Sequence, residues 1–74
     1  MYKSIAVIGS SEELQELIQE LESKGLKCTY ETAPLHEIAS VVIYPGGSYG
    51  TYFMTNPMAD VTYTVNDFKN LNLL

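Results

Sequence analysis

The spacing of apolar residues predicts a strand followed by a helix in the first third of the chain. Residues 5–8 (IAVI) are a short, mostly β-branched apolar run, typical of a strand buried on both faces. Apolar residues then recur every three or four positions, at Leu14, Leu17, Ile18 and Leu21. Ser10 and Glu13 have the spacing of a capping box, and Gly25 suits the position just after a helix. We therefore predict a helix over residues 11–24.

The middle of the chain predicts two more strands. Residues 26–32 alternate loosely and indicate a second strand. It completes a strand–helix–strand unit, which should cross over right-handedly and pair its two strands in parallel. Pro34 suits the start of a short helical turn over residues 35–39. Residues 41–44 (VVIY) form another buried-type strand, and we expect it beside the first strand at the sheet centre.

The last third has weaker patterns. Residues 45–50 (PGGSYG) indicate a loop, and residues 51–56 have features of either a strand or a helix that Pro57 would end. Alternation over residues 61–65 (VTYTV) predicts a half-buried edge strand. Asn66 is placed to cap a final turn that reaches Leu71.

These elements predict one α/β domain over residues 1–74. We expect a small Rossmann-like sheet in two or three layers, with a βαβ start and a C-terminal hairpin or edge strand. A right-handed crossover places the second strand on one side of the first and the third strand on the other. The expected strand order is therefore 2-1-3.

Composition and charge narrow the function classes. Apolar residues make up 46% and charged residues 18% of the chain, which supports a folded core, and no apolar run is long enough to cross a membrane. The net charge of −5, with no arginine, argues against nucleic acid as a partner. One cysteine and one histidine argue against a disulfide framework and a metal site, and we expect no cofactor. The absence of a signal-peptide pattern predicts a cytoplasmic protein.

Two loops rich in glycine and serine are the candidate ligand site. Ligands of open α/β sheets bind beyond the carboxyl ends of the strands, and in the 2-1-3 order both loops would meet at that edge. The candidate ligand-binding residues are Gly9, Ser10, Ser11, Pro45, Gly46, Gly47, Ser48, Tyr49, Gly50 and Thr51. Glu12 and Glu13 would repel a highly charged phosphate, so a nucleoside or a nucleotide of low charge fits better. Tyr44, Tyr49 and Tyr52 could stack on its base or pack in the core.

The segments VVIYPGGSYGT (residues 41–51) and IAVIGSS (residues 5–11) carry a family resemblance. They resemble the Pro-Gly-Gly-x-Gly-Thr loop and the opening Gly-Ser-Ser turn of the cytokinin-riboside-phosphate hydrolases, the LOG or lysine-decarboxylase-like proteins. The resemblance implies a Rossmann-like nucleotide-binding fold. It places Gly46, Gly47, Gly50 and Thr51 against a phosphate or ribose, with Gly9 and Ser10 opposite.

The chain also departs from that family. Met54 stands where the family has its glutamate, no arginine is present, and the loop is one residue longer. The expected protein is therefore a non-catalytic module that binds a small nucleotide-like ligand and sequesters it, as an anti-defence protein would. The alternative is an acidic protein-interaction or inhibitor module of the phage accessory type. The aromatic content and the exposed edge at residues 61–65 predict a homo-oligomer in either case.

Overall fold

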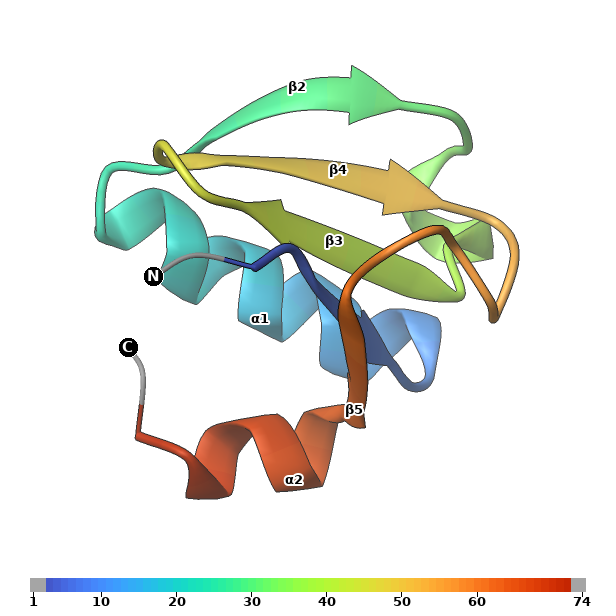
Figure 1. Cartoon of the computed structure of the whole chain (residues 1–74). Coiled ribbons are helices and arrows are strands. Elements are labelled where there is room, and N and C mark those ends of the chain that lie inside the picture. The colour runs from blue at the N-terminus through green and yellow to red at the C-terminus, as the bar shows by residue number, and fades with distance from the viewer. Residues whose placement is uncertain (1–2, 73–74) are drawn as a thin grey trace.

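The computed structural model describes residues 3–72, which form one mixed five-stranded sheet with two helices (Figure 1). The elements in chain order are β1 (Ile5–Ile8), α1 (Ser11–Ser23), β2 (Lys27–Glu31), the 3-10 turn η1 (Leu35–Glu37), β3 (Ser40–Tyr44), β4 (Ser48–Tyr52), β5 (Val61–Thr64) and α2 (Val65–Asn70). The predicted α/β class and the strand–helix–strand start are confirmed. The prediction that the two strands of this unit pair with each other is wrong, because β4 and β3 lie between β2 and β1.

Helix α1 begins and ends where local chemistry predicted. The Ser10 hydroxyl accepts a hydrogen bond from the Glu13 backbone N–H at 3.2 Å, and the Glu13 carboxylate accepts one from the Ser10 N–H at 3.0 Å. Gly25 has a φ of 92° just after the helix, a conformation that glycine adopts without strain. The apolar stripe of the helix is buried against the sheet.

The strand order is β2-β4-β3-β1-β5, so the predicted 2-1-3 order is wrong. Strand β1 pairs with β3 in antiparallel fashion and with β5 in parallel, while β3 and β4 lie between β1 and β2. The link from β2 to β3 explains why β3 runs antiparallel to β1. Residues 32–39 contain only the short turn η1, whereas a parallel return needs a crossover of about a dozen residues or more. Strand β3 therefore runs back against β1.

Strands β3 and β4 form a hairpin instead of a strand followed by a long loop. The turn is Pro45 to Gly47, and both Gly46 and Gly47 have positive φ, of 106° and 91°. Residues 48–51, which the sequence placed in a ligand loop, belong to β4 and pair with β3. Strand β4 ends at Tyr52, and residues 53–56 are neither strand nor helix.

The end of the described chain is mostly as predicted. Strand β5 lies at the sheet edge beside β1, which confirms the predicted edge strand. The final helical turn is α2, but its cap is Thr64, whose hydroxyl accepts a hydrogen bond from the Asp67 N–H at 3.1 Å. The predicted cap, Asn66, lies inside the helix.

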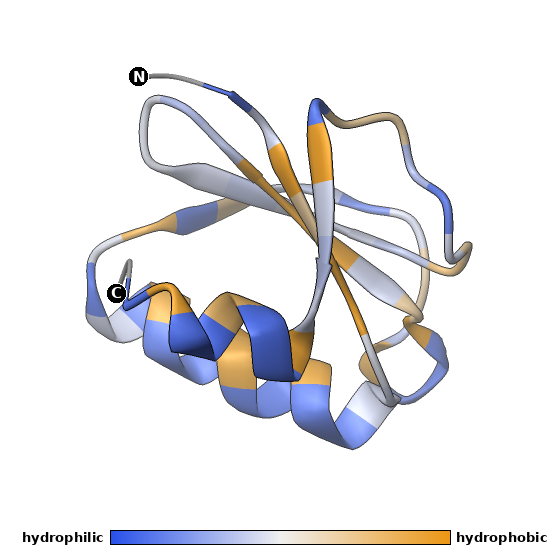
Figure 2. Cartoon of the chain, turned by 60° about the horizontal axis from the view of Figure 1, so that its bottom comes forward, coloured by the Kyte–Doolittle hydropathy of each residue, from blue (hydrophilic) through white to orange (hydrophobic). Residues whose placement is uncertain are grey.

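Both helices cover the same face of the sheet, and this face carries the main core (Figure 2). The buried core residues on that side are Val7, Leu14, Leu17, Ile18, Leu21, Ala33, Ile38, Val41, Tyr49, Val65 and Phe68. Residues 53–60 connect the end of β4 to the start of β5, so they travel back along the sheet past β3 and β1. They do so on the face without helices (Figure 1), where Ala6 and Val42 are fully buried.

Candidate functional site

The two loops that the sequence predicted to meet lie at opposite ends of the sheet. Ile8 pairs with Ser40 at one end of the β1–β3 ladder, and Ile5 pairs with Ile43 at the other. Residues 9–11 follow Ile8, whereas residues 45–47 follow Tyr44 at the far end. The predicted crevice between these loops therefore does not form, because the antiparallel course of β3 carries its carboxyl end away from Gly9.

The residues of the first loop have structural roles. A Cβ on Gly9 would lie 2.8 Å from Val65 Cγ2, so only glycine lets α2 approach the end of β1 so closely. Ser10 caps α1, and Ser11 is its first residue. A cavity of about 410 Å³ opens beside Gly9, but its charged lining residue, Glu13, is an anion. This cavity therefore does not suit a phosphate.

The residues of the second loop separate into a turn and a strand. A Cβ on Gly46 or Gly47 would meet open space, so these glycines are explained by the positive φ of the turn. Ser48 opens β4, and Gly50 is buried, with space for a Cβ limited by Tyr52 and Tyr30 at 3.0 and 3.1 Å. Thr51 is buried on the opposite face from Gly50.

The tyrosines proposed to stack on a base do not share one surface. Tyr49 is buried on the helix-covered face, where its hydroxyl donates to Glu22 Oε2 at 2.7 Å. The hydroxyls of Tyr44 and Tyr52 hydrogen-bond to each other on the opposite face. Tyr30 packs edge-on against Tyr52, with ring centroids 5.9 Å apart. The aromatic cluster on the helix-free face is therefore Tyr30, Tyr44 and Tyr52.

The two most exposed large apolar side chains of the described residues, Phe53 and Met58, belong to one segment, residues 53–58 (FMTNPM), which we call the apolar loop. Phe53 is 61% exposed and Met58 is 97% exposed, and Met54 is exposed as well. Tyr30, on the edge strand beside Tyr52, is another exposed aromatic residue. Exposed apolar residues that gather in one place mark interaction sites more often than isolated ones do.

The apolar loop has no regular secondary structure, but contacts fix it at several points. The Ala39 N–H donates to the Tyr52 carbonyl at 2.8 Å, and the Ser40 hydroxyl donates to the Met54 carbonyl at 2.6 Å. Pro57 is buried within the loop. Beyond it, Asp60 Oδ2 accepts hydrogen bonds from the Ser4 N–H at 2.8 Å and the Ser4 hydroxyl at 3.1 Å. Phe53 and Met58 are thus presented on a backbone that is held in place.

The single histidine and the single cysteine of the chain are both exposed. His36 is exposed and pairs with the adjacent Glu37 at 3.2 Å, and Cys28 is an exposed free thiol on the edge strand β2. Within residues 3–72, no three His, Cys, Asp or Glu side chains gather in a way that could hold a metal ion. Among the helices of the same residues, none is long and apolar enough to cross a membrane.

Comparisons of the chain with protein-family models, with curated proteins and with solved structures found no match. The resemblance to the cytokinin-riboside-phosphate hydrolases therefore stays a prediction from two short segments. The fold itself is a small α/β domain with one mixed five-stranded sheet and two helices.

Proposed function

We propose that this domain is a non-catalytic protein-interaction module that binds its partner through the apolar loop. The observation that carries the proposal is the exposure of Phe53 and Met58 on a segment that hydrogen bonds and a buried proline hold in place. Binding residues are commonly placed on loops that a rigid scaffold positions. This is the acidic interaction module that the sequence left as the alternative function.

The energetics favour binding at this loop. Full burial of a phenylalanine or methionine side chain stabilises a complex by about 1.5–3 kcal/mol. Methionine adapts to irregular surfaces because its side chain is unbranched and polarizable. The Ser40 hydroxyl already holds the loop backbone at Met54, and Ala39 holds the adjoining residue Tyr52. Little conformational entropy is therefore lost there on binding.

Charge indicates the chemistry of the partner. The chain carries a net charge of −5, and five of its nine acidic residues lie on α1: Glu12, Glu13, Glu16, Glu20 and Glu22. Two copies of such a chain repel each other at long range, whereas a basic partner is attracted. We therefore propose a different protein, with an apolar pocket for Phe53 and Met58 and a basic surface around it. The homo-oligomer stays a prediction, which sedimentation of the purified chain tests.

Site-specific photo-crosslinking in the source cell tests the proposal. A photo-reactive residue in place of Met58 should capture one protein, and the additional substitution Phe53→Ser should abolish the adduct. The same photo-reactive residue in place of the exposed His36 is the matched control and should capture none. If positions 58 and 36 give the same adducts, or neither gives any, the apolar loop is not the binding surface.

The nucleotide-binding hypothesis stays a prediction, but it has lost the shared edge on which it was based. A thermal-shift panel of nucleosides, nucleotides and cyclic nucleotides at millimolar concentration tests it. A ligand that binds the native state raises the melting temperature by linkage, so a flat panel would contradict the hypothesis.

A further inference from the structure

The sheet ends in two edge strands, β2 and β5, which differ in how well they are protected against pairing with another strand. Strand β2 carries Lys27 and Glu31, and its register against β4 shifts between Cys28 and Tyr30. Charged side chains and register shifts of this kind discourage the addition of a further strand. Strand β5 (VTYT) contains no charged residue and pairs with β1 without a shift. The β5 edge is therefore the less protected of the two.

The pairing with β1 identifies the backbone groups on the outer side of β5. The Val61 N–H donates to the Ser4 carbonyl at 3.3 Å, so it points towards β1. No described peptide bond is cis, and in a trans peptide the C=O points opposite to the N–H. Because successive peptide groups of a strand alternate in direction, the groups that point away from β1 are the Asp60 carbonyl, the Thr62 N–H and carbonyl, and the Thr64 N–H. Thr62 and Thr64 are exposed, so another strand can reach this side.

These outward-facing groups are complementary to themselves under a two-fold rotation. When two β5 strands pair in antiparallel fashion with Thr62 opposite Thr62, the two residues exchange both of their N–H to carbonyl hydrogen bonds. Each Thr64 N–H then meets the Asp60 carbonyl of the other copy, so every outward-facing group is paired. The groups that this register does not use are engaged within the chain. The Asp60 N–H donates to the Ser4 carbonyl at 3.1 Å, and the Thr64 carbonyl belongs to the N-cap of α2.

The side chains match in the same register. Val61 of one copy lies opposite Tyr63 of the other, and both are half-buried on the helix-covered face, where Tyr63 packs against the core. An aromatic residue directly opposite a β-branched one stabilises an antiparallel pair. The two Thr62 side chains lie opposite each other on the other face, and neither carries a charge.

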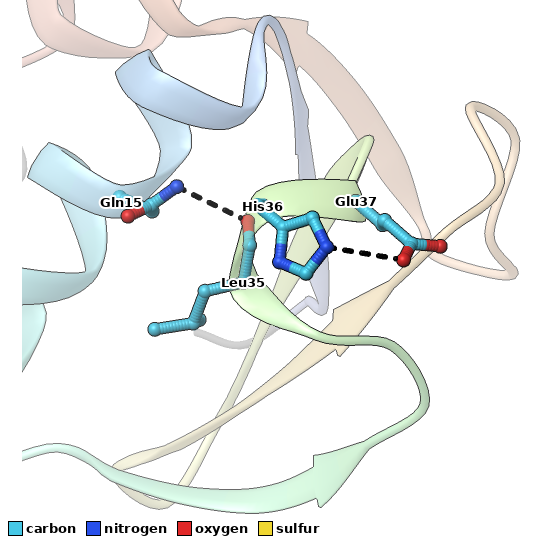
Figure 3. Close-up of polar contacts among 4 residues, drawn as sticks. All are labelled: Gln15, Leu35, His36 and Glu37. Atoms are coloured by element: carbon cyan, nitrogen blue, oxygen red, sulfur yellow. Dashed lines mark hydrogen bonds and ion pairs between the residues drawn. The ribbon is translucent and has the colours of Figure 1, made fainter.

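Most of the acidic charge lies in other elements. Seven of the nine acidic residues fall within residues 12–37, on α1, β2 and η1. On η1, Glu37 also pairs with His36 at 3.2 Å (Figure 3). Residues 40–72 contain only two aspartates and one lysine. Repulsion between exposed charges more than about 8 Å apart is largely screened at physiological salt. The net charge therefore weakens pairing at β5 without preventing it.

We propose that two copies of the chain associate through their β5 strands, in antiparallel fashion about a two-fold axis at Thr62. The two five-stranded sheets then join into one continuous sheet. This contact does not involve the apolar loop, so it is independent of the proposed function. A strand of four residues buries less area than a stable interface needs, so the dimer should dissociate on dilution.

Sedimentation equilibrium of the purified chain, at low to high micromolar loading and physiological salt, tests the proposal. The average mass should rise with loading towards that of a dimer. Thr62→Lys should raise the dissociation constant at least about tenfold, because it places two like charges directly opposite each other. The matched control, Thr29→Lys, adds the same charge to the β2 edge and should not weaken the dimer. Since either lysine lowers the net negative charge, general electrostatics alone would strengthen association in both variants. A monomer at every loading, or equal effects of the two lysines, would overturn the proposal.

Disulfide trapping tests the register without relying on the lysine variants. In a Cys28→Ser background, Thr62→Cys places two cysteines opposite each other with Cα atoms about 5.5 Å apart, a separation that a disulfide bridges. With oxidised glutathione as the oxidant, this variant should form a covalent dimer several-fold faster than the wild type. The wild type is the control, because its exposed Cys28 lies on the other edge strand. Equal rates in the two proteins would show that β5 is not the contact.

Discussion

Gly9 and Gly50 lie at positions where the neighbouring residues leave no space for a side chain. A Cβ on Gly9 would meet Val65, and one on Gly50 would meet the ring of Tyr52 and the Cβ of Tyr30. In a sequence, such glycines cannot be distinguished from glycines that let a ligand approach the backbone. The two interpretations differ in what fills the space where a side chain would lie. At Gly9 and Gly50 that space is filled by other residues of the protein.

Substitution of Gly9 tests this packing directly. Gly9→Ala should destabilise the domain by about 1–3 kcal/mol, because the added methyl group overlaps Val65, a stiff side chain. The measurement is urea unfolding followed by circular dichroism. The matched experiment places Gly9→Ala in a Val65→Ala background, where the same substitution should have a much smaller effect. An equal loss in both backgrounds would contradict the proposed contact.

Tyr49 should make the domain sensitive to alkaline pH. Its pKa is raised in the folded state, first by burial and then by the hydrogen bond to Glu22. A group whose pKa is raised in the folded state contributes to stability. This contribution is fully present below the unfolded pKa of about 10 and is lost as the pH rises above that value. The urea midpoint should therefore fall from pH 10 upwards. The fall should be shallower in Tyr49→Phe, and an identical slope in both proteins would contradict this assignment.

At the scale of the element, the capping box of α1 is the clearest local determinant. Ser10→Ala should destabilise the domain by about 1 kcal/mol at neutral pH, whereas Ser11→Ala, one position further along, should have little effect. The backbone hydrogen bond from Ser10 lowers the pKa of Glu13, so the capping contribution should be lost as the pH falls below about 4.5. Unfolding midpoints measured between pH 7 and pH 3 should show this loss. In Glu13→Gln the midpoint should depend less on pH over the same range.

Local sequence signals were sufficient to predict helix α1 but not to predict the strand order of the sheet. The caps of α1 and its apolar stripe all lie within residues 10–25, so short-range chemistry determines the helix. The order of the strands depends on contacts between distant residues, such as the antiparallel pairing of residues 5–8 with residues 40–43. The short link over residues 32–39 was the available indication that β3 would run back, because it leaves no room for a crossover helix.

The apolar loop was missed for a similar reason. Residues 53–58 have no period of two or 3.6, so the apolar pattern could not show whether Phe53 and Met58 face the core or solvent. Thr51 was predicted to be a ligand-binding residue of a loop, but it is buried in strand β4. Its place beside Glu31 depends on the β2–β4 pairing, which only the fold reveals.

At the scale of the whole molecule, the two faces of the sheet are covered in different ways. Helices α1 and α2 and a continuous apolar core cover one face, and the irregular segment of residues 53–60 crosses the other (Figures 1 and 2). Two neighbouring side chains of this segment differ in their contribution to the fold. Pro57 is buried and helps to cover the sheet, whereas Met58 is exposed and contributes little to the fold.

This difference in burial predicts that substitutions of the two neighbouring residues differ in their effect on stability. Pro57→Gly should lower the free energy of unfolding by about 1–3 kcal/mol, because it removes a buried ring and gives the unfolded chain more freedom. Met58→Ser should change that free energy by less than about 0.5 kcal/mol, because the side chain is 97% exposed. Urea unfolding compares the two variants with the wild type. Because Met58→Ser leaves the fold intact, any partner that it loses is lost at the binding surface, whereas a large destabilisation by Met58→Ser would show that the loop serves only to complete the fold.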